Sequence, residues 1–330
     1  MRAVLESLQT ARAQRRPARQ WRLMSACMCA GVLGWALAQA ASAETFQRRV
    51  PADSRGEVQI VNVSGEVQVR GWDRNEVLVD AELGARVERV DVRSEPQRTI
   101  IEVVAKAGGQ GASDLTVHVP TESSLTIRSV SADQSVENVH GAQRLQAVSG
   151  SISTELWRHE LEARTVSGEV SVRGRAGSTG DGQRSPGGED DSGAGLLRVT
   201  TVSGGMRLDQ VGAELELNTV AGNIEVTADR LRRGRIKTTN GDVDLTTGLA
   251  PEARLDAEAI NGELRLHLRG AVDASFEVET FNGRIDNCFG PEPQRTREFA
   301  PGRELRFKEG DGRGLVRIKT LNGGIEICKK

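Results

Sequence analysis

The feature of this 330-residue chain that most constrains its fold is a short unit that recurs along most of its length. Each copy has an alternating apolar segment, a turn that usually reads apolar residue, Ser or Asn, then Gly, and a second alternating segment. From residue 132 onward the copies are 18 to 21 residues apart, except for two steps of 36 and 40 residues that contain one period plus an inserted loop. The turn glycines are Gly65, Gly150, Gly168, Gly204, Gly222, Gly241, Gly262, Gly283 and Gly323, and Val130-Ser131-Ala132 is a degenerate copy.

Two all-β folds contain such turns, because Asn-Gly between alternating segments is also a strong hairpin signal. Hairpins do not need a constant period, whereas a coil of parallel strands does, since each turn lays its side chains on the equivalent ones of the turn below. The constant period therefore favours an all-β, single-chain parallel β-solenoid.

Apolar residues recur at fixed places in the unit. The second residue after each glycine is always apolar, and the fourth is nearly so, while the first and third are mostly polar; strand alternation therefore puts the even positions inside. The residue before the turn makes another stacked apolar column. The second-position residues are Val67, Ile152, Val170, Met206, Ile224, Val243, Leu264, Ile285 and Ile325.

The repeat also suggests how the chain is organised. Residues 44–128 contain strand-like segments but one copy of the turn, so they are expected to form an irregular N-terminal β cap on the first turn. Residues 129–330 are expected to form the solenoid, with inserted loops at 175–195 and 289–314.

The start of the chain has the order of charged, apolar and small residues that is typical of a secretory signal peptide. Six arginines precede the apolar segment 24–38, and Ala41-Ser42-Ala43 offers a cleavage site after Ala43. The apolar segment is short for a membrane span, so we expect a periplasmic or secreted protein with no membrane span after cleavage. Residues 44–330 hold 38 Lys or Arg against 45 Asp or Glu, and this acidic balance argues against a nucleic-acid partner.

The two cysteines after residue 43 occupy equivalent positions, since Cys288 and Cys328 each follow a turn glycine by five residues. Equal register on consecutive turns brings two Cα atoms within disulfide range, so we expect a disulfide that clamps the last turn. His267 has the same position after Gly262 and is expected to stack beside Cys288. A metal held by these three residues is the weaker alternative because a fourth ligand is not evident; we predict no metal and no other cofactor.

Charged residues at the third position after the turn glycines form a candidate surface-binding column on the outside of the coil. They alternate in sign, with Arg265 expected between Asp244 and Asp286, as cross-strand pairing on a solvated sheet favours. The alternative is a groove that cleaves polysaccharides, in which a carboxylate pair and a cation act on the sugar. We predict no catalytic residues. The column comprises Arg207, Glu225, Asp244, Arg265 and Asp286.

The units Val-Ser-Gly-Glu-Val-x-Val and Asn-Gly-x-Ile-x-Ile, placed behind a signal peptide, resemble the bacterial β-strand-repeat family of putative adhesins, a domain of unknown function. The resemblance runs from about residue 57 to residue 330. It implies a β-solenoid in the cell envelope that binds an envelope component or a protein partner and has no established catalysis. The alternatives are the polysaccharide-acting enzyme and an accessory or sensor protein in an envelope-stress pathway.

Overall fold

The structure is a computed structural model that describes residues 44–106, 111–157, 159–175, 195–297 and 301–330. Within these ranges all regular elements are β-strands, and none of the described segments is an apolar helix of membrane-spanning length. The expected export signal, residues 1–43, and nearly all of the loop expected at 175–195 lie outside the described residues.

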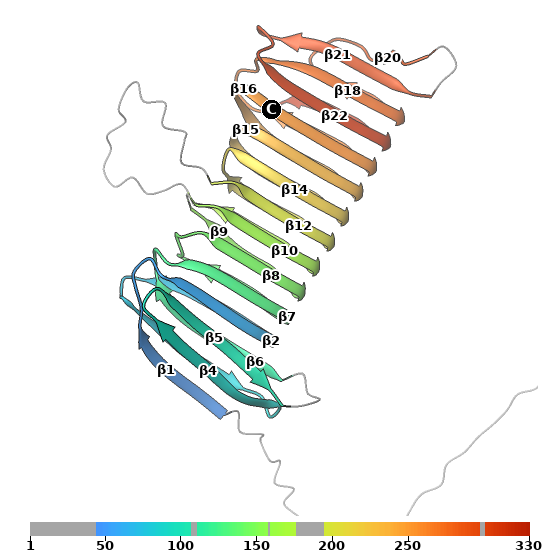
Figure 1. Cartoon of the computed structure of the whole chain (residues 1–330). Coiled ribbons are helices and arrows are strands. Elements are labelled where there is room, and N and C mark those ends of the chain that lie inside the picture. Colours follow the sequence, from blue (N-terminus) through green and yellow to red (C-terminus); the bar gives the residue numbers. More distant parts are fainter. Residues whose placement is uncertain (1–43, 107–110, 158, 176–194, 298–300) are drawn as a thin grey trace, which may run out of the picture. The chain divides into compact units, whose positions relative to one another are not determined.

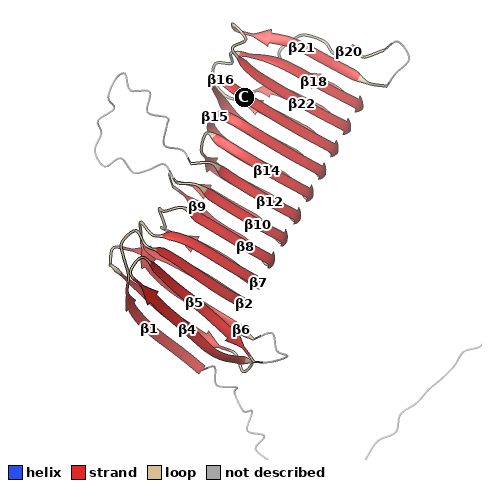
Figure 2. Cartoon of the chain, in the orientation of Figure 1, coloured by secondary structure: helices blue, strands red, loops and turns tan. Residues whose placement is uncertain are grey.

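The described strands belong to one mixed sheet that folds over on itself (Figures 1 and 2). They are β1 (Glu44–Pro51), β2 (Glu57–Trp72), β3 (Glu76–Leu83), β4 (Val87–Glu95), β5 (Arg98–Ala105), β6 (Ala112–Pro120), β7 (Ser124–Glu137), β8 (Gln143–Ser149), β9 (Ile152–Leu156), β10 (Leu161–Ser167), β11 (Val170–Gly174), β12 (Leu197–Ser203), β13 (Met206–Val211), β14 (Glu214–Ala221), β15 (Ile224–Asn240), β16 (Val243–Asn261), β17 (Leu264–Leu268), β18 (Ala274–Asn282), β19 (Ile285–Asn287), β20 (Gln294–Arg295), β21 (Arg303–Glu309), β22 (Gly314–Asn322) and β23 (Ile325–Lys329).

Each copy of the repeat forms one rung, which consists of an entry arm that leads into the turn and an exit arm that leaves it. We call the turn the corner. Entry arms pair in parallel with the entry arms of neighbouring rungs, as β8, β10, β12 and β14 do. Exit arms pair in the same way, as β9, β11 and β13 do. Side chains at equivalent positions consequently form columns that run from one rung to the next.

The predicted interior column is confirmed. The nine second-position side chains, from Val67 to Ile325, have exposed fractions of 0 to 4 %. Entry arms alternate in the same way, so that β12 buries Leu197, Val199 and Thr201 between outward-facing residues. Small aliphatic side chains fill this thin interior, which explains why the chain needs few aromatic residues.

The corner glycines are required for two physical reasons, which Gly222 illustrates. Its φ of +149° lies in a region that residues with a Cβ rarely adopt. A Cβ at this position would also lie 2.0 Å from the carbonyl oxygen of Gly204, the corner glycine of the preceding rung. Successive corners are therefore in direct backbone contact, and a side chain there would push two rungs apart.

The N-terminal strands join the same stack. β2 carries the corner at Gly65 and pairs in parallel with β7 from Glu57 to Arg70. On the other side of β2, its first half pairs with β5 and its second half with β6. Antiparallel pairs β4–β5, β1–β3 and β3–β6 complete this end.

The C-terminal rungs do not stack in chain order, which corrects the expectation that the copy at Gly323 is the last turn. β22 pairs with β16 on one side and β18 on the other, and β23 pairs with β17 and β19. The rung of residues 314–329 thus lies between two rungs that precede it in sequence (Figure 1). We call it the inserted rung.

The segment expected as a loop at 289–314 packs against the terminal rung. Its strand β21 runs antiparallel to β18, with β20 beside it. Phe307 of β21 stacks on buried Phe276 with ring centroids 4.4 Å apart, and Phe289 lies 5.7 Å from both rings. This aromatic cluster covers the interior at the end of the stack.

Candidate functional site

The most unusual surface of the described structure is an apolar column on the outside of the entry arms, immediately before the corners. The repeat predicts this column, and the structure shows that it faces solvent, since its residues are 45 to 51 % exposed. We call these residues the edge column. In stacking order they are Val130, Val148, Val166, Val202, Val220, Ile260, Leu321 and Phe281, with Thr239 between Val220 and Ile260.

The parity of the strand alternation explains this exposure. In β12 the inward positions end at Thr201, and the next residue, Val202, therefore points outward. Thr201 and Val202 are both uncharged, so the sequence does not show that they lie on opposite faces of the strand. The alternation within the entry arm, in which Leu197 and Val199 face inward, is the sequence signal that places Val202 on the surface.

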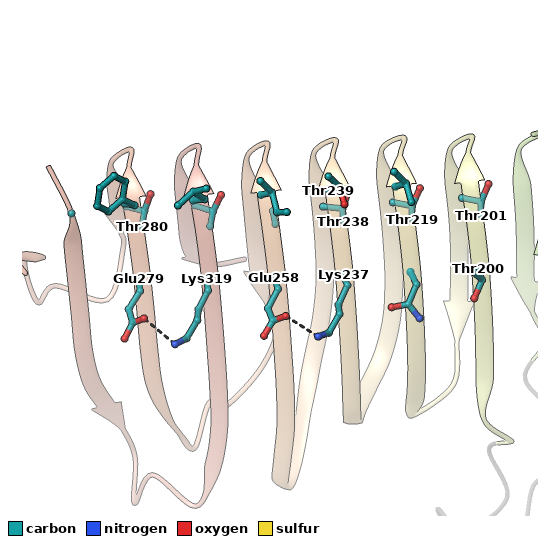
Figure 3. A pocket seen from close by; sticks show the side chains of 18 of the residues that line it. Thr200, Thr201, Thr219, Lys237, Thr238, Thr239, Glu258, Glu279, Thr280 and Lys319 are labelled. Atoms are coloured by element: carbon teal, nitrogen blue, oxygen red, sulfur yellow. Dashed lines mark ion pairs between the residues drawn. The ribbon is translucent and has the colours of Figure 1, made fainter. Parts of the chain in front are cut away.

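A row of polar residues runs beside the edge column, two positions earlier in each entry arm. We call it the polar row. Its C-terminal half contains ion pairs, because Lys237 Nζ lies 2.9 Å from a Glu258 oxygen and Lys319 Nζ lies 2.9 Å from a Glu279 oxygen (Figure 3). In stacking order the polar row is Arg128, Gln146, Arg164, Thr200, Asn218, Lys237, Glu258, Lys319 and Glu279.

A groove of about 800 Å³ lies between the two rows over the C-terminal rungs. Edge-column residues from Val202 to Phe281 form one side, and the polar row from Thr200 to Glu279 forms the other. Thr296, Gly302 and Glu304, from the segment that contains β20 and β21, contribute to its lining beyond the terminal rung. The groove runs across several neighbouring strands, so it suits a ligand or partner that extends along the stack (Figure 3).

A third row of entry-arm residues alternates in charge. Glu162, whose side chain is 10 % exposed, accepts a hydrogen bond of 2.8 Å from Arg144 Nε and also forms an ion pair with Arg164. The hydrogen bond from Arg144 holds the pKa of Glu162 below its ordinary value, against the opposing effect of burial. Further along, Arg198 Nε lies 2.9 Å from a Glu216 oxygen.

The lowered pKa of Glu162 makes stability depend on pH. The pair stabilises the fold fully at pH values above the pKa of Glu162 in the unfolded chain, and this contribution is lost as the pH falls through the folded-state pKa. We expect Glu162→Gln to lower the free energy of unfolding by about 2 kcal/mol at neutral pH, with the difference shrinking in acid. Urea titrations at several pH values measure it; Glu225→Gln, at a side chain that is 66 % exposed, is the control with almost no effect. A pH-independent difference for Glu162→Gln would contradict the assignment.

The candidate column predicted from sequence lies on the exit arms. The groove is lined by other residues, most of them on the entry arms. Arg207 forms ion pairs with Glu225 at 3.4 Å and Glu169 at 2.7 Å. Because of the inserted rung, Arg265 lies between Asp244 and Glu326, so the expected contact with Asp286 is wrong. Arg265 instead pairs with Glu263 of its own rung, and Asp286 pairs with Arg284.

The cysteines form the expected disulfide, with Cα atoms 4.8 Å apart. It joins the terminal rung to the inserted rung, and each of these has further neighbours, so the expected role of clamping a last turn at Cys328 is corrected. His267 pairs in register with Cys328, where the expectation was Cys288. Since both sulfurs are in the disulfide, neither supplies a thiolate for a metal, and the described residues contain no group of three potential metal ligands.

The stacked entry and exit arms, joined at glycine corners, define an all-β class of repeat protein. Within that class, the chain belongs to the Toastrack DUF4097 family, whose model matches residues 89–327. This is a family of unknown function, and the match confirms the resemblance inferred from the Ser-Gly and Asn-Gly units.

Solved structures of low similarity include a "putative adhesin" from Bacteroides fragilis, with 11 % identity over 88 % of this chain and 99 % of that chain, and a TM-score of 0.41. A "putative cell adhesion protein" from Clostridium sporogenes has 10 % identity over 87 % of this chain and 100 % of that chain, with a TM-score of 0.26. At TM-scores this low the similarity carries no functional information. None of the curated proteins matches the chain.

Proposed function

We propose that the protein is a non-catalytic binding or scaffold protein of the cell envelope, and that its edge column and groove hold the partner. The observation that carries the proposal is the edge column itself, in which eight apolar side chains in a line are about half exposed. Soluble proteins seldom leave contiguous apolar surface uncovered unless it serves an interaction. In this proposal the chain is a parallel β-solenoid with an N-terminal β cap.

The disulfide supports the proposed location in the periplasm or outside the cell. Disulfides persist in oxidising compartments and are rare in the cytosol. Export through the segment 1–43, with cleavage after Ala43, is part of the same proposal.

The charged exit-arm column supports a scaffold better than it supports an enzyme. A catalytic carboxylate is normally tuned by a desolvated site, but the side chains of Asp244, Asp286 and Glu225 are 44, 59 and 66 % exposed. Arginines lie beside two of these carboxylates, as solvated ion pairs do. We retain this column as a proposed second contact surface.

Co-sedimentation of the mature protein with separated outer membrane, peptidoglycan and secreted polysaccharide tests the proposal. We expect saturable binding to one fraction without release of sugar fragments. Leu321→Asp places a charge in the groove and should weaken this binding at least about tenfold. Gln97→Asp, which puts the same charge on the exposed turn between β4 and β5, should leave it unchanged.

Two results would contradict the proposal. Release of sugar fragments would show an enzyme, and binding that is insensitive to Leu321→Asp would place the contact elsewhere. Circular dichroism of both variants controls for the fold.

A further inference from the structure

We infer that the outer face of the entry arms holds a second site, a pocket that binds a phosphate monoester carried on a sugar. The pocket lies where the entry arms of β14, β15 and β16 begin, at the end opposite to the corners, and has a volume of about 340 Å³. We call it the arginine pocket. None of its residues lines the groove, so the inference goes beyond the proposed function. Its charged residues are Arg233, Arg235, Arg254, Glu214, Glu216 and Asp256.

The third row of entry-arm residues, which alternates in charge, gives the first observation. Arg235 lies in register between Glu216 and Asp256, yet it forms an ion pair with neither. Each of these carboxylates is bound to another arginine, since Arg198 Nε lies 2.9 Å from a Glu216 oxygen and Arg317 Nη1 lies 3.5 Å from an Asp256 oxygen. Within the described ranges, the guanidinium of Arg235 therefore has no acidic partner and is available to a ligand in the pocket that it lines.

The outward row next to it, at the start of the arms, gives the second observation. Arg233 and Arg254 are directly opposite each other on β15 and β16, and Leu315 is on the other side of Arg254. Like charges in this position repel each other and destabilise a sheet. Glu214, the acidic neighbour of Arg233, accepts a hydrogen bond from Arg232, and Arg254 forms no ion pair in the described part of the chain. A bound anion offsets the repulsion and gives Arg254 a partner.

The charge of the arginine pocket favours a dianion. Its charged residues and their ion-pair partners comprise six arginines and four carboxylates, which leaves two positive charges unbalanced. A phosphate monoester carries a charge of about −1.5 to −2 at neutral pH, whereas a carboxylate group carries a single charge. The fork of guanidinium donors also matches phosphate oxygens. The arginines are Arg198, Arg232, Arg233, Arg235, Arg254 and Arg317, and the carboxylates are Glu214, Glu216, Asp256 and Glu277.

The size and the other side chains of the pocket indicate what carries the phosphate. A volume of about 340 Å³ is at the lower end of the range for small-molecule sites, and it exceeds the volume of a phosphate group. The carboxylates of Glu214 and Glu216 remain partly exposed, so they can accept hydrogen bonds from hydroxyl groups. A sugar phosphate supplies both kinds of group, either as a soluble or polymeric saccharide or as the headgroup of a glycolipid.

Isothermal titration calorimetry of the mature protein with glucose 1-phosphate tests the arginine pocket. We expect saturable binding, which Arg235→Gln and Arg254→Gln each weaken about tenfold or more, because each removes charge-assisted hydrogen bonds to the phosphate. Glucuronate, which has a single negative charge on the same kind of ring, should bind at least about tenfold more weakly.

Arg128→Gln is the matched control. Arg128 is also an exposed, outward-facing arginine of an entry arm and has no ion pair among the residues that the structure describes, but it lies on β7, outside the arginine pocket. Its replacement changes the net charge by the same amount and should leave binding unchanged. Because Arg254→Gln removes a like-charge contact, its free energy of unfolding should not be lower than that of the unaltered protein. Urea titration of each variant checks that lost binding does not come from lost folding.

Flotation with vesicles distinguishes the two carriers of the phosphate. The vesicles consist of phosphatidylcholine with monophosphoryl lipid A, a glycolipid that has one sugar phosphate. Vesicle binding that is lost in Arg254→Gln supports the inference with a glycolipid headgroup. Binding of glucose 1-phosphate without vesicle binding supports it with a soluble or polymeric saccharide.

Three results would overturn the inference. They are no binding of either probe, equal weakening by Arg128→Gln and Arg254→Gln, and binding of glucuronate as tight as that of glucose 1-phosphate. Leu321→Asp, in the groove, should leave phosphate binding unchanged, so this inference and the proposed function can fail separately.

Discussion

Replacing Gly222 with Ala is expected to lower the free energy of unfolding by about 4 kcal/mol, from a strained φ and overpacking combined. The added Cβ would lie 2.0 Å from the Gly204 carbonyl oxygen, and the φ of +149° disfavours any side chain. Neither conflict can relax locally, because the atom in contact belongs to the backbone of a rung that is fixed on its other side as well. Chemical denaturation of both proteins measures the difference.

Gly205→Ala is the matched control for this prediction. Gly205 lies beside the corner glycine Gly204, but a Cβ there would meet only the Asn223 carbonyl oxygen at 3.6 Å, an ordinary contact. We expect a change of less than about 1 kcal/mol at this position. Equal effects at Gly222 and Gly205 would contradict the explanation by corner contact.

Replacing Cys288 and Cys328 together with Ser is expected to cost about 4 kcal/mol in the chain-entropy model, because the disulfide closes a loop of about 40 residues. The loss should appear mainly as faster opening of the inserted rung, since its strands β22 and β23 are held otherwise by pairing and packing. Hydrogen exchange at β22 and β23, compared with exchange at β10 and β12, measures where the loss occurs. Uniformly faster exchange in all four strands would contradict a local role.

Much of the fold could be predicted from the repeat because its physical cause is local. The corner needs glycine, and alternation places Val67 and its equivalents inside; both requirements appear in the nine copies that have a corner glycine. The disulfide was predictable for the same reason, since Cys288 and Cys328 occupy equal positions in their copies.

The order of the rungs could not be predicted. The 40-residue step between Gly283 and Gly323 fits two arrangements equally well. In one, a loop precedes a final rung; in the other, the chain passes the terminal rung and returns to form the rung before it. The interior residues of the two rungs, such as Ile285 and Ile325, are interchangeable in size and character. What separates the alternatives is β21 pairing with β18 and the phenylalanine cluster, which are long-range contacts.

The edge column was found as a pattern, but its exposure was not foreseen. Apolar residues are normally assigned to the interior, and Val202 follows the buried Thr201 without a polar residue to mark the change of side. Similarly, the neighbours of Arg265 depend on the order of the rungs. The charged column could therefore be identified from its position in the repeat, whereas its ion pairs could not.

The inserted rung has a consequence for how the molecule is made. During synthesis, the strands up to β19 emerge before residues 314–329, so the rungs cannot simply be added one after another in the order of translation. Until the final segment arrives, β16 and β17 on one side and β18 and β19 on the other face an empty slot with unpaired backbone groups. A chain truncated before this segment would expose two unpaired strand edges, which favour proteolysis and aggregation.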